Sequence, residues 1–201
     1  MKNKLIYGIA AIGIAALLVS CEKAPQAEID LTKASVDSAL LSGAAVYQSE
    51  ELAMLEDSMA AVMERIEAEN GKMFPSYSDL KTELESVKAY AGQVVQKTEA
   101  RKAEVQQEIQ TVLAEVKTLI EENKTLFAQA PKGKEGKEAL EQINAELTGI
   151  ETSVAETNEL VTKTEYIQAL DKSKLAKENA MAINNELKEV IAKTSKKPAR
   201  G

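Results

Sequence analysis

Cys21 is the single cysteine of this chain and the side chain whose type and setting most suggest covalent chemistry. A deprotonated thiol is a strong nucleophile. The chain has no histidine to serve as its base, so Cys–His and Ser–His–Asp catalysis are excluded. The same absence removes histidine metal sites and a histidine pH switch. Cys21 also has no second cysteine with which to form a disulfide within the chain, so its role must come from the residues around it.

The segment before Cys21 has the three parts of a secretory signal peptide. Residues 1–4 (MKNK) are basic, an apolar run follows from Leu5 to Leu17, and Ser20 is a small residue at the expected cleavage position. A transmembrane helix needs about 20 apolar residues, and this run is shorter and soon interrupted. We therefore predict that residues 1–20 form a cleaved signal peptide.

The four residues Leu18-Val19-Ser20-Cys21 resemble the lipobox of bacterial lipoproteins. The resemblance implies cleavage between Ser20 and Cys21, a diacylglycerol on the Cys21 thiol and an acyl chain such as palmitate on the new amine. Two or three acyl chains, at roughly 0.8 kcal/mol per buried methylene, hold a protein far more firmly than one. Glu22 is not the aspartate linked to inner-membrane retention in enteric bacteria. The expected location is therefore the periplasmic face of the outer membrane, with surface exposure left open.

The charge of the chain argues against nucleic acid as a partner. The net charge is -7, and removal of residues 1–20, which hold Lys2 and Lys4 and no acid, leaves -9. Binding to a phosphate backbone depends on a basic surface, which an acidic chain without a long basic stripe lacks. No Gly-rich phosphate loop is present either. We expect no cofactor, no bound metal and no enzymatic activity.

The remaining composition is typical of long helices. Aromatic residues make up 3%, tryptophan is absent, and Ala, Leu, Val, Ile and Met alternate with Glu, Lys and Gln. The pattern predicts an all-α fold, an elongated antiparallel helical bundle or coiled-coil hairpin of about five helices over residues 27–193. A tether over residues 21–26 precedes it, and a basic disordered tail over residues 194–201 follows. The expected helices span residues 27–41, 49–70, 76–130, 138–161 and 166–193.

Each expected helix has an apolar stripe with alternating spacings of three and four residues, as in a heptad repeat. Gly43, Asn70-Gly71 and Pro131 mark helix ends, and Ser49 is the expected N-cap of the second helix. The stripes are Leu31, Ala34, Ser38 and Leu41; Leu52, Leu55, Met59, Val62 and Ile66; Leu80, Leu84, Val87, Ala91, Val94, Thr98, Arg101, Val105, Ile109, Val112, Val116, Leu119 and Leu126; Leu140, Ile143, Leu147, Ile150, Val154, Thr157 and Val161; and Ala169, Ser173, Ala176, Ala180, Ile183, Leu187 and Val190.

The third helix, about 50 residues and roughly 75 Å long, is expected to pair with both later helices folded back along it. That register places Leu126 opposite Leu140 and Val116 opposite Ile150, and it continues to Leu84 near Ile183 and Leu80 near Leu187. The weak stripe at Thr98 and Arg101 then faces the interruption at residues 162–165. The two short early helices would cover only the membrane-proximal half, as a four-helix bundle.

The distal half would then be a bare two-helix hairpin. A bare pair buries less surface per residue than a bundle, so a partner could cover it. We therefore take Val112, Val116, Ile150 and Val154 as a candidate interaction tip; the alternative is a self-sufficient hairpin. The tail residues Lys196, Lys197 and Arg200 would lie near the membrane and could contact anionic headgroups or peptidoglycan, or be inert.

Four methionines in and after the second helix, Met54, Met59, Met63 and Met73, could line a soft ligand groove. Core filling is the favoured interpretation, because Met59 lies on the apolar stripe. The many glutamates lie three or four residues from lysines, which is typical of solvated helix faces and not of a carboxylate metal site.

The segment Gly43-Ala44-Ala45-Val46-Tyr47, then Glu51-Leu52-Ala53, and Tyr77 before the next helix resemble a family of small α-helical bacterial lipoproteins of unknown function. The likeness covers Cys21 to about Lys102 best. It implies an envelope location and a bundle, and it supplies no catalytic residues. The chain differs from the family in having Val and Leu where alanine is usual along the third helix.

Together these features predict a lipid-anchored envelope protein that acts as a non-enzymatic scaffold or protein-interaction module. Its partners would be the membrane, through the N-terminal lipid, and an envelope protein or peptidoglycan, with a homo-oligomer left open. Two alternatives remain: a helical bundle that binds a small apolar ligand or lipid, and a surface-exposed adhesin.

Overall fold

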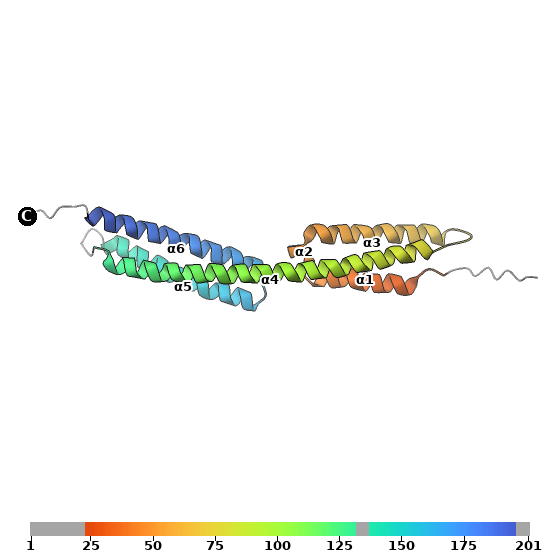
Figure 1. Cartoon of the computed structure of the whole chain (residues 1–201), viewed down its shortest axis with the longest axis horizontal. Coiled ribbons are helices and arrows are strands. Elements are labelled where there is room, and N and C mark those ends of the chain that lie inside the picture. Colours follow the sequence, from red (N-terminus) through yellow and green to blue (C-terminus); the bar gives the residue numbers. More distant parts are fainter. Residues whose placement is uncertain (1–22, 132–136, 196–201) are drawn as a thin grey trace, which may run out of the picture. The chain divides into compact units, whose positions relative to one another are not determined.

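The computed structural model describes residues 23–131 and 137–195, and over these ranges it contains six helices and no strand. The predicted all-α class is confirmed (Figure 1). The chain forms two compact units. Unit 1 comprises residues up to Ser38 and residues 53–92, and unit 2 comprises residues 39–52 and those from 93 onward. The predicted signal peptide, Cys21 and residues 196–201 of the predicted basic tail lie outside the described residues. Thr194 and Ser195, predicted as the start of that tail, are the last residues of α6 (Tyr166–Ser195).

Unit 1 is built from α1 (Gln26–Leu41), α3 (Ser49–Asn70) and the first part of α4 (Ser78–Gln129). The predicted stripes of α3 and α4 are confirmed here, because their aliphatic side chains are buried against one another. The Thr32 hydroxyl of α1 donates to the Leu84 carbonyl of α4 at 3.3 Å. The buried set of α3 and α4 is Leu55, Met59, Val62, Ile66, Leu80, Leu84, Val87 and Ala91.

The predicted stripe of α1 is wrong. Leu31 and Leu41 are 57% and 86% exposed, and Ala34 and Ser38 also face solvent. The buried side is offset along the helix and consists of Pro25, Ile29, Thr32, the half-buried Val36 and Ala39. Both sets have helical spacing. The buried one includes Thr32, whose hydroxyl is satisfied by the Glu28 and Leu84 carbonyls, so a polar residue is tolerated there.

The start of α3 also differs by one residue from the prediction. The Leu52 amide donates to the Gln48 carbonyl at 2.9 Å, so the helical hydrogen bonds begin at Gln48 and Ser49 lies inside the helix. A short helix, α2 (Ala44–Tyr47), precedes it and was not predicted. Gly43, between α1 and α2, has φ of 87°, a left-handed conformation that glycine adopts without steric cost. This conformation explains why a glycine occupies the predicted end of α1.

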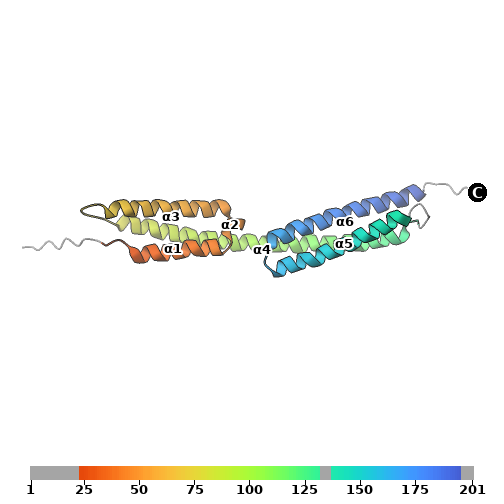
Figure 2. The same ribbon diagram turned by 180° about the vertical axis from the view of Figure 1, so that it is seen from behind.

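Unit 2 contains the rest of α4, with α5 (Lys137–Thr162) and α6 (Tyr166–Ser195) packed against it (Figure 2). The predicted pairing of α4 with α5 is confirmed, because Val112, Val116, Ile143, Leu147 and Ile150 share one buried cluster. From α6, the same cluster receives Ala176, Ala180, Ile183 and Leu187. The unit is therefore a three-helix bundle and not a bare hairpin.

The predicted course of α6 along the first part of α4 is wrong, because the chain reverses at Thr164. The Glu165 amide donates to the Leu160 carbonyl and the Thr164 amide to the Val161 carbonyl, both at 3.0 Å. Thr164 has φ of 62°, and these bonds form the Schellman motif that ends a helix. The interruption at residues 162–165 is thus a turn, from which α6 runs antiparallel to α5.

Hydrogen bonds and ion pairs fix α6 parallel to α4. Lys174 pairs with Glu108, and Lys177 with Glu115, so the residue numbers rise together on both helices. The buried Asn123 amide donates to the Ala180 carbonyl and accepts from the Asn184 amide, each at 2.8 Å. Buried asparagines of this kind specify one register of a helix pair. Leu80 and Leu84 therefore belong to unit 1, and Ile183 and Leu187 pack in unit 2.

The last turns of α6 were predicted to lie near the start of α4. They lie instead near the C-terminal end of α4, because Leu187 shares a buried cluster with Ala130 and Ile143. The prediction that the C-terminal segment returns to the other end of α4 is wrong for the same reason, the turn at Thr164.

Candidate functional site

The predicted interaction tip is part of the core of unit 2. Val112, Val116 and Ile150 are buried, and Val154 is half-buried against the same cluster. Their burial follows from the position of α6, which covers the α4–α5 pair where the sequence suggested a bare hairpin. The three buried side chains are therefore core residues and not a contact surface. Val154 is still reached from solvent, because it lines a hollow between α4 and α5. Ser20 and Cys21, the predicted cleavage and lipid-attachment residues, lie outside the described residues.

The structure brings together a different group of residues, which we call the tyrosine pocket. It is a hollow of about 540 Å³ in unit 2, where α2 and the end of α1 meet α4 and the start of α6. Tyr47 and Tyr166 contribute its aromatic side chains. Both side chains also pack against a core cluster of Val105, Ile109, Ala169 and Leu170. The lining is Leu41, Ser42, Gly43, Tyr47, Glu99, Lys102, Ala103, Gln106, Thr164 and Tyr166.

Lys102 is the central charged group of the tyrosine pocket. Its Nζ lies 2.9 Å from Glu99 Oε1 and 5.8 Å from the centroid of the Tyr47 ring. The first contact neutralises the charge of the ammonium, and the second is a cation–π contact. Gly43 lies beside the lysine: a Cβ atom there would be 3.6 Å from Lys102 Cε. That distance is an ordinary van der Waals contact, so the positive φ of Gly43, and not lack of space, is what favours glycine there.

Burial raises the pKa of the Tyr47 hydroxyl above its ordinary value of 10.0. The positive charge of Lys102 opposes this effect, whereas Tyr166 and Glu99 add to it. Tyr47 is therefore protonated at neutral pH and can both donate and accept a hydrogen bond. With Gln106, Thr164 and the Lys102–Glu99 pair nearby, the tyrosine pocket offers neutral or compensated polar groups beside aromatic rings.

This arrangement suits reversible binding of a small polar molecule. Its aromatic rings can stack on a flat or apolar face, and its amide, hydroxyl and charged groups can hydrogen-bond to a polar edge. The sequence did not predict the pocket, because Tyr47, Lys102 and Tyr166 come from three distant segments. The rarity of aromatic residues was the available signal, since two of the five tyrosines meet here.

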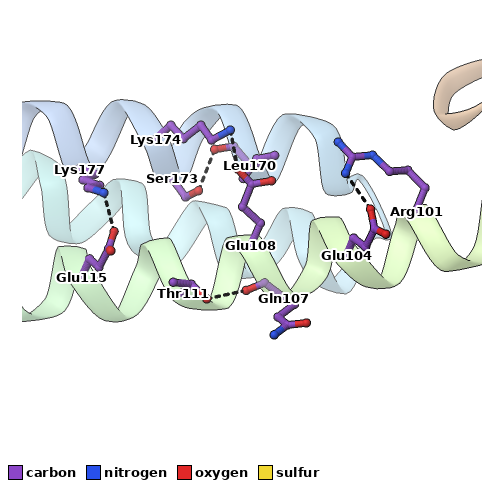
Figure 3. Close-up of polar contacts among 10 residues, drawn as sticks. All are labelled: Arg101, Glu104, Gln107, Glu108, Thr111, Glu115, Leu170, Ser173, Lys174 and Lys177. Carbon is purple, nitrogen blue, oxygen red and sulfur yellow. Dashed lines mark hydrogen bonds and ion pairs between the residues drawn. The ribbon is translucent and has the colours of Figure 1, made fainter.

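A row of ion pairs runs along the outside of the α4–α6 contact (Figure 3). Lys174 Nζ lies 2.7 Å from Glu108 Oε1, and Lys177 Nζ lies 2.6 Å from Glu115 Oε2. Arg101 and Glu104 pair within α4 at 3.0 Å. Each such exposed pair contributes at most about 1 kcal/mol. The two pairs between the helices show which residues of α4 and α6 lie side by side, and their partial exposure agrees with the prediction that these glutamates lie on solvated faces.

The methionines do not form one groove. Met59 is buried in the core of unit 1, which confirms its predicted role, whereas Met54 and Met73 are exposed.

Within residues 23–131 and 137–195, no group of three or more Asp, Glu, Cys or His side chains is placed to hold a metal ion. Over those ranges, too, no helix has an apolar stretch long enough to cross a bilayer.

Comparison with known proteins gives no relative: no family model, no curated protein and no solved structure matches the chain.

Proposed function

We propose that this protein is a lipid-anchored, non-enzymatic scaffold or interaction module of the bacterial cell envelope. The observation that carries the proposal is the lipobox-like segment ending at Cys21, followed five residues later by the first helix at Gln26. So short a tether would keep unit 1 close to the membrane that holds the lipid. The outer membrane, through its periplasmic face, is the proposed location.

The length of α4 supports a scaffold role. α4 is one continuous helix of 52 residues, about 78 Å of helical rise, and it contributes to both units. Its aliphatic stripe from Leu80 to Ile120 is buried, so a partner would contact the exposed polar sides of the helix.

Exposed leucines on α1 support an interaction role. Leu31 of unit 1 is 57% exposed, and Leu41 of unit 2 is 86% exposed. Large apolar side chains exposed to solvent can mark contact sites for other macromolecules. An envelope protein is the proposed partner for these leucines, with a second copy of the chain as the alternative.

Photocrosslinking in intact cells tests the interaction role. A photoreactive residue at Leu31 or Leu41 is expected to give discrete crosslinked species, and one at the buried Val116 is the control and should give none. Thr118, exposed on α4, samples a second surface. If Leu31, Leu41 and Thr118 all give only the uncrosslinked chain while the protein is present in the envelope fraction, the scaffold proposal fails.

A second candidate function is binding of a small neutral polar molecule, and the tyrosine pocket favours it. A screen of neutral sugars and amides should then find compounds that raise the melting temperature of the chain. Gln106→Ala, which removes one polar group of the lining, should abolish that rise, and Gln107→Ala, on an exposed neighbouring position, should retain it. Equal responses in both variants would place the binding elsewhere and remove this candidate.

A further inference from the structure

The loop between α3 and α4 presents two adjacent apolar side chains to solvent. Met73 is 83% exposed and Phe74 is 70% exposed. Phe74 is one of only two phenylalanines in the chain. A single exposed apolar residue is ordinary in a folded protein. A neighbouring Met-Phe pair at the tip of a loop is a compact apolar projection, which suits contact with an apolar phase.

The base of this loop is held by hydrogen bonds and an ion pair on both sides of Met73 and Phe74. The Glu69 carboxylate accepts from the Ser76 amide at 2.8 Å and pairs with Lys72 Nζ at 2.5 Å. The buried Tyr77 donates its hydroxyl to Asn70 Oδ1 at 2.5 Å. The bonds from Lys72 and Ser76 lower the pKa of Glu69, so its carboxylate is ionised at neutral pH.

The loop lies at the end of unit 1 where α1 begins. α3 runs toward this end and α4 runs away from it, and the first turn of α1 lies beside them in both views (Figures 1 and 2). Pro25 is buried, and its carbonyl accepts from the Ile29 amide at 3.0 Å, which ties the chain to unit 1 there. Cys21 precedes Pro25 by four residues, so its Cα is at most about 14 Å away. A lipid on Cys21 would therefore bring the bilayer to this end.

We propose that Met73 and Phe74 insert into the interfacial region of the same bilayer that holds the acyl chains on Cys21. The proposal rests on the proposed lipid attachment and adds a second membrane contact that orients unit 1. Lys72 is paired with Glu69, so the contact is mainly apolar. It should therefore depend little on salt or on the fraction of anionic lipid.

An environment-sensitive fluorophore on the full, acylated chain tests this contact. Cys21 is blocked by its lipid in that protein, so a Met73→Cys variant has one reactive thiol. Met54→Cys is the matched control: it is an exposed methionine on α3, sixteen residues before Asn70 and hence about 24 Å of helical rise from the loop. Both proteins are reconstituted into vesicles of phosphatidylethanolamine and phosphatidylglycerol at 3:1.

The expected result is a blue-shifted emission at position 73 that a lipid-borne quencher suppresses, with neither change at position 54. Emission that is alike at the two positions in vesicle-bound, acylated protein would overturn the loop contact and leave the lipid anchor intact. A blue shift at 73 that appears without vesicles and grows with protein concentration would also overturn it, in favour of a second copy as the occupant. A chain recovered from cells without acyl groups would remove both proposals.

Discussion

Replacing Cys21 with serine is expected to abolish incorporation of fatty acid into this protein. The chain has no other cysteine, so no second thiol is available to form the thioether to diacylglycerol. A single acyl chain gives only reversible membrane binding, with an association constant of about 10⁴ M⁻¹, and stable attachment needs the two or three chains that Cys21 would carry. The measurement is metabolic labelling with an alkyne fatty acid, quantified per molecule of protein.

Ser20→Ala is the matched control, because it retains a small residue before the cleavage position. This variant should be labelled like the wild type. Labelling of Cys21→Ser at the wild-type level would place the acyl groups elsewhere, and a wild-type chain that takes up no label would refute the lipid anchor.

Replacing Leu55 with alanine is expected to lower the free energy of unfolding of unit 1 by about 2–5 kcal/mol, because truncating a fully buried leucine removes contacts and leaves a cavity. Leu55 has no solvent exposure and lies at the centre of the α3 stripe. Denaturant unfolding of residues 22–201, followed by circular dichroism, measures the loss.

Met54→Ala, at the neighbouring position, provides the comparison. Its side chain is 53% exposed, so its removal should change stability by no more than about 0.5 kcal/mol. Equal losses in the two variants would show that the packing of α3 differs from that described.

The helices of largest aliphatic content were the most predictable from sequence. Leu55, Val62 and Ile66 on α3 have no competing apolar set on the same helix, so spacing alone identified their buried face. The same holds for Ile143, Leu147 and Ile150 on α5. In these segments burial of large apolar side chains is the main favourable contribution to folding, and their spacing in the sequence shows which face of the helix is buried.

α1 and the turn after α5 could not be predicted because they depend on tertiary contacts. α1 has two apolar sets, and burial of the one with Ile29 and Thr32 depends on packing against other helices. Thr164 adopts a left-handed conformation that threonine rarely has, so no glycine or asparagine marked the turn. That one missed turn reversed α6 and made the tip residues Val116 and Ile150 look exposed.

The tyrosine pocket was unpredictable for a related reason. Tyr47 and Tyr166 lie near Lys102 because α5, folded back along α4, ends beside the middle of α4, so that α6 starts there. Sequence spacing relates residues within one helix and says nothing of such meetings between helices. The predicted fold-back did place residues 162–165 near Thr98 and Arg101, and Thr164 indeed lines the pocket with Glu99 and Lys102.

The intact mass of the protein extracted from cells tests the central claim most directly. The account predicts a polypeptide that begins at Cys21, lacks residues 1–20 and carries the added mass of a diacylglyceryl group and one further acyl chain. A chain that still begins at Met1, or one that begins elsewhere with no added lipid mass, would contradict it.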